Sequence, residues 1–350
     1  MQIRSVQWQD GRFGPDIGTP EASASLDDLR TAIPNCNYMG LDARIRCADG
    51  SNECTPEEEV LGELDAAISE IHAHGLKVIL RVKLRGATSL LFVPPDIPTY
   101  LANYASSIAY WADYAQSRHV EVLGIGCEMS PEMEAADWSG VIAVARSYFK
   151  GRLYYNTNWW WNTVLRDVKL NATWMRLLDI LAISAYPDKL ISATNLHPTS
   201  DELEYGWRNA YVSNLGESLP ESFHRFSAQH GGKPLLYHIG LASGAGAASQ
   251  PWAYVSDAAV DLDVQANWFD AFFRVLGSDH GVFLDGGWQT WPDKNPNNNE
   301  FIVQNKPAES VVQYYFSILT PSSQLGNLLI PLGFVGGVLW LRGGKSKLRG

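Results

Sequence analysis

Residues 120–131 read VEVLGIGCEMSP, and this stretch decides how the chain is organised. Its continuous run of apolar and β-branched residues predicts a strand buried on both faces, as in parallel sheets. The run ends at Glu128, and Ser130 followed by Pro131 is typical of the start of a helix. In barrels of parallel strands, the chemistry lies where the strands end. Glu128 is therefore the first candidate functional residue.

Similar apolar runs recur on both sides of this stretch and alternate with helical patterns. We predict strands at 3–8, 38–43, 77–82, 120–127, 152–156, 180–184, 235–239 and 282–285. We predict helices at 22–33, 56–74, 97–118, 138–149, 172–178, 219–230 and 264–276. Such alternation implies parallel βα units, and eight units favour one closed (β/α)8 barrel, the TIM-barrel fold, over residues 1–318. The polar segment 187–214 is expected to be a long loop that caps the active end.

The size and charge of the chain narrow the function classes. Single α/β barrels commonly exceed about 200 residues, so 350 residues with 46% hydrophobic content suit one large domain. The formal net charge of −11 argues against non-specific binding of nucleic acid and against an anionic membrane surface. Neither observation identifies a substrate.

The two ends of the chain give different indications of location. The first residues, MQIRSVQWQDG, show no charged-then-apolar signal peptide. Residues 325–341, LGNLLIPLGFVGGVLWL, are followed by the basic tail RGGKSKLRG. We expect 319–324 to be a linker and 325–350 to be a membrane anchor whose basic end is cytoplasmic. This orientation places the barrel outside the cytoplasm.

The cysteines and histidines give no local support for a metal or a cofactor. Cys47 and Cys54 bracket a polar loop, and either a disulfide in an exported domain or two free thiols fits the sequence. No CxxC or HExxH spacing occurs. A metal site built from His238, Glu128 and Asp285 lacks any supporting spacing. We expect neither a metal nor a cofactor.

Charged and aromatic residues follow the predicted strands and are expected to meet in one cleft. Tryptophan rings among hydrogen-bonding groups suit a neutral polyhydroxylated ligand, so an oligo- or polysaccharide is the expected partner. Any one of these tryptophans fits a core or lid position equally well. The candidate binding residues are Trp8, Asp42, Lys83, Asn158, Trp159, Trp160, Tyr186, Asp285, Trp288 and Trp291, with Trp161 as a further platform.

Over residues 3–318 the chain resembles glycoside hydrolase family 113, the TIM-barrel β-mannanase group of retaining glycosidases. The segments that carry the resemblance are HAHGLKVILRVKL, GIGCEMS, DILAISAYP, PLLYHIGLASGAGAASQPW and NKPAESVVQYYF. The resemblance implies an endo-β-mannanase-like activity with Glu128 as the general acid/base. The family nucleophile is a glutamate at the end of the seventh strand. This chain has His238 at that position, within YHIG.

The histidine leaves three alternatives open. Retaining hydrolysis uses two carboxyl groups about 5–5.5 Å apart, and a neutral imidazole supplies no negative charge. Asp285, Tyr186 or Tyr237 could replace the nucleophile. His238 could instead activate water opposite Glu128, since inverting pairs are about 6.5–9.5 Å apart. The third alternative is a membrane-displayed glycan-binding protein without catalysis.

The alignment of His238 with the nucleophile does not depend on a small shift in register. No Asp or Glu occurs between Glu221 and Asp257, so a shift of a few residues supplies no carboxylate. We predict that His238 lies at the cleft floor facing Glu128. The family's double-displacement chemistry is then impaired in this chain.

Overall fold

The computed structural model describes residues 3–9, 19–48, 50–85, 92–160, 162–187, 189–209, 215–253, 257–277, 280–289 and 297–318. The linker and anchor predicted at 319–350 lie outside the described residues, as do Trp161 and Trp291. Within the described part of the chain, no helix is both long enough and apolar enough to cross a membrane.

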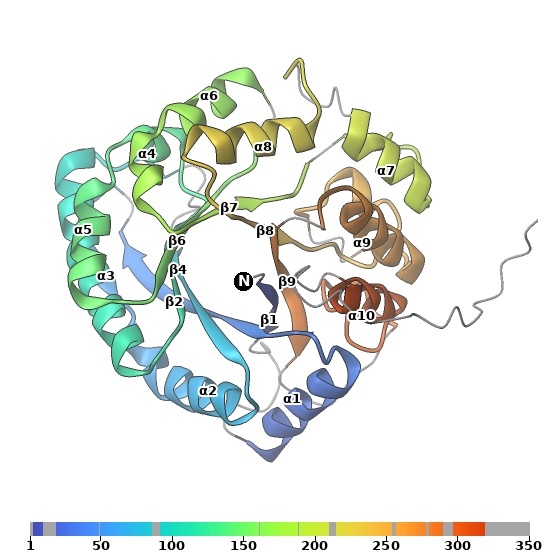
Figure 1. The fold of residues 1–350 in the computed structure, drawn as a ribbon, viewed down its shortest axis with the longest axis horizontal. Coiled ribbons are helices and arrows are strands. Elements are labelled where there is room, and N and C mark those ends of the chain that lie inside the picture. Colours follow the sequence, from blue (N-terminus) through green and yellow to red (C-terminus); the bar gives the residue numbers. More distant parts are fainter. Residues whose placement is uncertain are drawn as a thin grey trace, which may run out of the picture.

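Eight parallel strands form a closed barrel, which confirms the predicted fold (Figure 1). The barrel closes because β1 pairs with both β2 and β9 in parallel register. The short strand β3, Cys54–Pro56, adds to the edge of β2 in the antiparallel direction. The barrel strands are β1 Arg4–Gln9, β2 Tyr38–Cys47, β4 Lys77–Arg85, β5 Val122–Cys127, β6 Arg152–Thr157, β7 Ile180–Ser184, β8 Leu235–Ile239 and β9 Gly281–Gln289.

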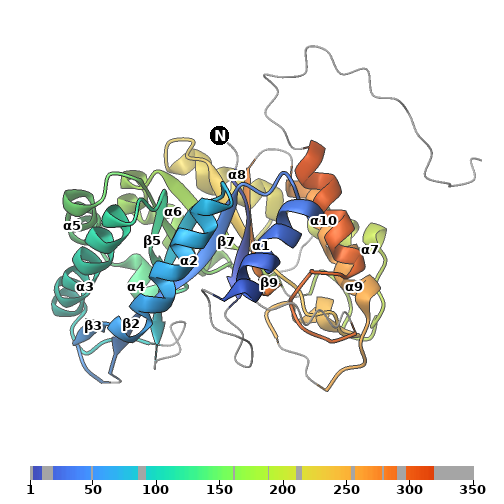
Figure 2. The ribbon, with the colours of Figure 1, turned by 90° about the horizontal axis from the view of Figure 1, so that it is seen from below.

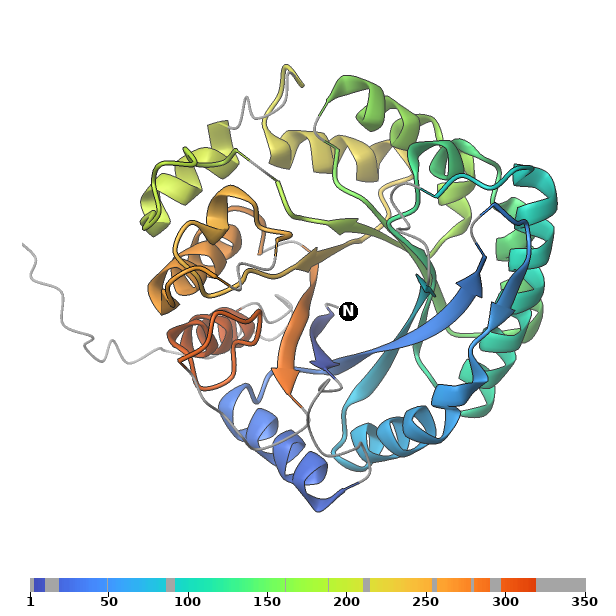
Figure 3. The ribbon, with the colours of Figure 1, turned by 180° about the vertical axis from the view of Figure 1, so that it is seen from behind.

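The helices form a ring around the barrel when it is viewed from either end (Figures 1 and 3). Several begin at side chains that cap their first backbone N–H groups, such as Asp96 before α3 and Ser218 before α8. The α-helices are α1 Pro20–Ala32, α2 Leu61–Ala73, α3 Ile97–Ser117, α4 Pro131–Ala135, α5 Ser139–Tyr148, α6 Thr163–Asn171, α7 Ser200–Asn209, α8 Leu219–Gln229, α9 Leu262–Leu276 and α10 Pro307–Ile318. The 3-10 helices are η1 Glu58–Val60, η2 Thr173–Leu177 and η3 Ala247–Ser249.

Three local predictions need correction. The segment 187–214 contains the helix α7, whose acidic first turn suits a helix start although the whole segment is polar. The helix predicted at 56–74 starts at Leu61, after η1. The helix predicted at 172–178 is the 3-10 turn η2, and it is preceded by α6, which the sequence reading missed.

A layer of side chains fills the barrel interior. Strand residues alternate between the two faces of the sheet, and every second residue points to the barrel axis. Gly40 leaves the space that Phe283 occupies, because a Cβ at Gly40 would lie 2.1 Å from the Phe283 Cζ atom. The interior layer consists of Ile3, Tyr38, Ile79, Val122, Tyr154, Ile180, Ala182, Leu236 and Phe283. This apolar layer forms the base on which the polar residues of the barrel mouth rest.

Candidate active site at the barrel mouth

Polar side chains follow the apolar layer at the carboxyl ends of the strands. In β4, Ile79 belongs to the interior layer, so Arg81 and Lys83 continue its inward-facing row. In β2 and β9, the same alternation brings Asp42 and Asp285 above Tyr38 and Phe283. The sheet geometry therefore collects charged groups from distant parts of the sequence at one end of the barrel.

Arg81 is the centre of this charged cluster. Its Nε donates to Asp42 Oδ1 at 2.8 Å, and its Nη1 donates to Asp285 Oδ1 at 2.6 Å. Lys83 Nζ lies 3.1 Å from Asp42 Oδ2. The Arg81 side chain is only 2% exposed. Two cations thus face two carboxylates, and the four formal charges sum to zero, as buried charges require.

The cluster keeps both carboxylates ionised. Burial alone would raise the pKa of Asp42, but Arg81 and Lys83 outweigh it and lower that pKa to about 2. Burial likewise opposes ionisation of Asp285, yet the cations Arg81 and Lys83 hold its pKa far below the usual range. Each aspartate therefore carries a full negative charge at neutral pH.

His238 is fully buried within the barrel. Its ring stacks on Phe283 with ring centroids 4.3 Å apart, and Tyr154 lies nearby at 5.7 Å. Burial lowers the pKa of His238 to about 4, although Asp285 partly offsets this effect. The imidazole is thus neutral at pH 7. Because Arg81 Nη1 lies 3.0 Å from Nδ1 and can only donate, Nδ1 accepts and we assign the proton to Nε2.

Glu128 lies directly after β5 and is partly exposed. Its backbone has a φ of 50°, in the left-handed region that residues other than glycine seldom adopt. The Glu128 N–H donates to the carbonyl of Asn156 at 2.8 Å, and this bond fixes the turn. Ser184 Oγ donates to Glu128 Oε1 and in turn accepts from Asn156 Nδ2 at 2.9 Å. The end of β6 and the end of β7 therefore position the glutamate.

Tyr186 connects the two sides of the mouth. Its hydroxyl donates to Asp285 Oδ2 at 2.8 Å. Burial raises the pKa of Tyr186 well above its usual value, and the negative charges of Asp285 and Glu128 raise it further. Tyr186 therefore remains a hydrogen-bond donor at neutral pH. Ser184 and Tyr186, two residues apart at the end of β7, hold Glu128 and Asp285 respectively.

Most of the predicted sugar platforms are core residues. Trp8 is 2% exposed, and Trp160 and Trp288 have no exposed surface. Trp160 packs between Phe223 and Phe226 with its indole N–H bonded to Ser222, and the Trp288 N–H bonds to the Ser25 carbonyl. A ring without exposed surface cannot stack on a sugar, so these three predictions are corrected. Trp159 is 6% exposed and belongs to the same core.

The alternation along β1 explains the correction at Trp8. Trp8 belongs to the core between the barrel and its helices, whereas its neighbour Gln7 faces the mouth. Gln7 Nε2 donates to Asp42 at 2.9 Å, and Gln7 Oε1 accepts from the Gly286 N–H. The strand period counted from Ile3 would have selected Gln7.

Asn158 is positioned by a buried ion pair that sequence reading missed. Its backbone N–H donates to Glu134 Oε1 at 3.2 Å, and Glu134 Oε2 lies 2.6 Å from Lys169 Nζ. Arg81 is the other important omission. A charged residue inside the buried run KVILRVKLR was the available signal, because such a charge needs partners in the folded protein.

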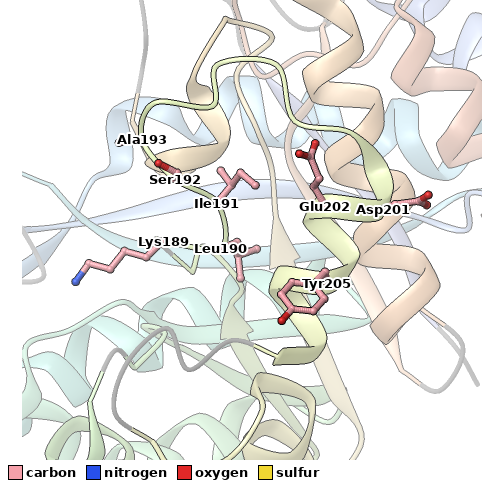
Figure 4. A pocket seen from close by; sticks show the side chains of 8 residues that line it. All are labelled: Lys189, Leu190, Ile191, Ser192, Ala193, Asp201, Glu202 and Tyr205. Atoms are coloured by element: carbon pink, nitrogen blue, oxygen red, sulfur yellow. The ribbon is translucent and has the colours of Figure 1, made fainter.

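A surface pocket of about 680 Å³ lies between the segment after β7 and helix α7, and Glu128 is not among its lining residues (Figure 4). Lys189, Leu190 and Tyr205 are among its lining residues. A smaller pocket of about 40 Å³ includes Gln7 and Asp42. The charged cluster and Glu128 identify the candidate active site better than the larger pocket does, since the ionisable residues that line that pocket, Lys189, Asp201 and Glu202, point in different directions (Figure 4). Across the described ranges, no three His, Cys, Asp or Glu side chains are grouped to hold a metal ion.

Comparisons with known proteins agree with this architecture. Residues 16–306 match the model of Glycoside Hydrolase Family 113. The chain is 22% identical to the family 113 β-mannanase AaManA from Alicyclobacillus acidocaldarius, with a TM-score of 0.71 over 91% of this chain and 98% of that one. A second structure, a family 113 β-1,4-mannanase, gives 21% identity and a TM-score of 0.69 over the same shares.

A more distant likeness extends to another glycosidase family. A family 5 mannosidase from Rhizomucor miehei is 12% identical, with a TM-score of 0.59 over 91% of this chain and 93% of that one. At these identities the structural matches establish the fold alone. No curated protein matches the chain. The family model covers most of the sequence, and the chain therefore belongs to glycoside hydrolase family 113.

Proposed function

We propose that this protein binds a β-mannan-type oligo- or polysaccharide at the barrel mouth and hydrolyses it with Glu128 as the general acid/base. Family membership supports a carbohydrate substrate. The observation that carries the proposal is the setting of Glu128: it is partly exposed, it follows the fourth barrel strand, and Ser184 and Asn156 orient it. A carboxyl group so placed can protonate the leaving oxygen as the glycosidic C–O bond breaks.

We assign the second carboxylate to Asp285. The reaction develops positive charge at the anomeric carbon, and the neutral His238 supplies no negative charge to stabilise it. Asp285 is ionised and is held by Arg81 and Tyr186. Its side chain is 18% exposed, whereas the His238 side chain has no exposed surface. Among the alternatives open to this chain, Asp285 is thus the group with both the charge and the access.

A glycan-binding protein without turnover is the competing candidate. The resemblance implies that His238 stands where the family has its nucleophile, and this favours the binding protein. Arg81 and Tyr186 also already engage both oxygens of Asp285. A carboxylate in a tight ion pair is a weaker nucleophile than one that is less strongly held. Water activation by His238 is less well supported, because its Nδ1 is occupied by Arg81 and the ring is buried.

The test is incubation with manno-, gluco- and xylo-oligosaccharides, comparing wild type with Glu128→Gln and Asp285→Asn. We expect turnover of the manno series only, with loss of about 10²–10⁴-fold in Glu128→Gln. Glu132→Gln, which changes an exposed carboxylate four residues further on in α4, is the matched control. Turnover unchanged in Glu128→Gln would refute the assignment. Binding by all variants without turnover by any would establish the competing candidate.

We also propose that residues 325–341 anchor the barrel to a membrane from its extracytoplasmic side. The length of this apolar run and the basic tail after it support the proposal. The full chain should sediment with phospholipid vesicles, and a chain ending at residue 318 should remain in the supernatant. Equal partition of the two proteins would exclude an anchor in this segment.

A further inference from the structure

Two cysteines face each other on the hairpin that extends from the carboxyl end of β2. Cys47 and Cys54 are direct partners in the antiparallel register of β2 and β3. The hairpin packs beside α3, as the side view shows (Figure 2). Tyr100 on α3 lies 3.5 Å from the Cys47 sulfur, and Ser107 on the same helix donates to the Cys54 carbonyl. Both thiols are therefore held on one side of the hairpin against a single helix.

The register alone satisfies the main requirement for a covalent bridge. Residues directly opposite in an antiparallel pair have Cα atoms about 4.5–5.5 Å apart. Disulfides join Cα atoms about 4.4–6.8 Å apart, so no backbone movement is needed. The two sulfurs already lie in contact, 2.7 Å from each other.

The other two cysteines have different surroundings. Cys36 is buried, and its thiol bonds to the backbone carbonyls of Arg4 and Tyr38. Cys127 is buried at the end of β5 and accepts from Asn156. Neither sulfur is in contact with Cys47 or Cys54 in the described structure, so one pairing is favoured over all others.

We propose that Cys47 and Cys54 form a disulfide when the protein meets an oxidising thiol–disulfide couple such as glutathione. The Cys47 thiolate attacks one sulfur of oxidised glutathione and releases a glutathione thiolate. The Cys54 thiolate then attacks the Cys47 sulfur of the mixed disulfide and releases the second glutathione thiolate. Two protein thiols are oxidised, one glutathione disulfide is reduced to two thiols, and the protons pass to the released thiolates.

The surroundings of Cys47 favour the first of these steps. A hydrogen bond from Cys54 lowers the pKa of the Cys47 thiol against the opposing effect of burial. The thiolate is the attacking species in exchange, so a lowered pKa increases its population at neutral pH.

The bridge would restrain a rim of the mouth. Immediately after β3, Glu57 accepts from Arg46 on β2 and from Arg85 at the end of β4. Glu57 is 4% exposed, so this pairing fixes the hairpin against the barrel. A disulfide between Cys47 and Cys54 would link β2 to β3 covalently and reduce the conformational entropy of the unfolded chain.

The pairing can be read from one proteolytic peptide. Cleavage after Arg46 and Lys77 releases residues 47–77, which contain both cysteines and no internal Lys or Arg. Full-length protein is equilibrated with oxidised glutathione, denatured, alkylated and digested without reductant. We expect the 47–77 peptide to carry no alkyl group and to gain two after prior reduction. Two alkyl groups without reduction, or stable glutathione adducts, would overturn the proposal.

A stability measurement provides an independent check. The thermal midpoint of oxidised wild type should fall when a phosphine reductant is added. In Cys47→Ser/Cys54→Ser, and in Cys54→Ser alone, the reductant should have no effect. Cys36→Ser changes a buried thiol that contacts backbone carbonyls and no other cysteine of the described structure. This variant should retain the wild-type response to reductant. An equal response in wild type and the double variant would refute the bridge even if every variant folds.

Discussion

The two sides of the barrel mouth hold their carboxylates in different ways. Asp285, on β9, is fixed by the guanidinium of Arg81 and the hydroxyl of Tyr186. Glu128, after β5, accepts instead from a neutral hydroxyl, that of Ser184, and is also partly exposed. Positive surroundings keep the Asp285 carboxylate ionised. The comparison separates a carboxylate held by a cation from one held by a neutral hydroxyl.

The largest effect is expected from Arg81→Met, which removes the cation that holds Asp285. Asp42 and Asp285 would lose their shared partner while still largely buried. Breaking a buried ion pair in this way costs about 3–5 kcal/mol of unfolding free energy. Urea denaturation at pH 7 measures this loss.

The matched control is Arg118→Met. Arg118 pairs with Asp65 where both side chains are more than 40% exposed, so its removal should cost less than about 1 kcal/mol. Equal losses in the two variants would mean that the Arg81 cluster contributes no more than a surface pair.

The next largest effect is expected from His238→Glu, which adds a third carboxylate beside Asp42 and Asp285. Two cations would then face three carboxylates, and we expect a loss of roughly 3 kcal/mol from burying the uncompensated charge. His238→Glu/Asp285→Asn returns the cluster to zero net charge and should recover most of this loss. Denaturant unfolding measures stability, and the anomeric configuration of manno-oligosaccharide products measures the chemistry.

The double variant should also form product with retained configuration at a higher rate than wild type. If wild type already forms a covalent glycosyl-enzyme that His238→Glu abolishes, then the original histidine does not impair double displacement. If the double variant is no more stable than the single one, Asp285 and residue 238 do not share the same charge balance.

The buried imidazole of His238 makes the free energy of unfolding depend on pH. We expect this change to be similar to, or smaller than, the loss in His238→Glu. The folded pKa of His238 is about 4 and the unfolded value is about 6.5. Above pH 6.5 both states are neutral, and the stability is full. As pH falls from about 6.5 to about 4, only the unfolded state gains the proton, so stability falls by at most about 3 kcal/mol.

His238→Asn isolates this contribution, because the amide oxygen can still accept from Arg81 but does not titrate. The variant should lose less stability than wild type between pH 6.5 and pH 4, as measured by urea unfolding at a series of pH values. Parallel curves for the two proteins would show that His238 has no depressed pKa.

The smallest effect is expected on the other side of the mouth, from Ser184→Ala. The change removes one hydrogen bond to Glu128 and leaves Asn156 without its hydroxyl partner. A hydrogen bond in such a setting contributes about 1 kcal/mol, or roughly fivefold in kcat/KM on manno-oligosaccharides. Ser222→Ala, which removes a buried hydroxyl bonded to Trp160, should leave kcat/KM unchanged. Equal losses in both variants would point to a general effect on folding.

The barrel could be predicted because each strand is encoded locally. Apolar runs such as VEVLGIGC specify buried strands, and their alternation with helical patterns specifies the parallel order. The helix α7 was not predicted, because its polar composition resembles that of a loop. Its packing against α9 is visible only in the folded chain. Glu128 could be singled out for the same local reason, as the carboxylate that ends an apolar run.

The charged cluster could not be predicted from local patterns. Arg81 joins Asp42, His238 and Asp285, partners 39, 157 and 204 residues away along the chain. Which of these groups meet depends on the strand register around the closed barrel. The predictions of tryptophan sugar platforms were wrong for a different reason. A ring at a strand end can point to the barrel axis or to the surrounding helices, and only the alternation counted from the interior layer decides between them.

The position of the cluster depends in part on a residue that contributes no atoms to it. Phe283 supports the imidazole of His238 from below and lies 4.9 Å from the Arg81 guanidinium carbon. That ring occupies the space left by Gly40 on β2, the second strand along the wall from β9. Any side chain at position 40 would lift Phe283, and the charged layer above it would move towards solvent. The depth of the mouth is thus set by an absent methyl group on β2.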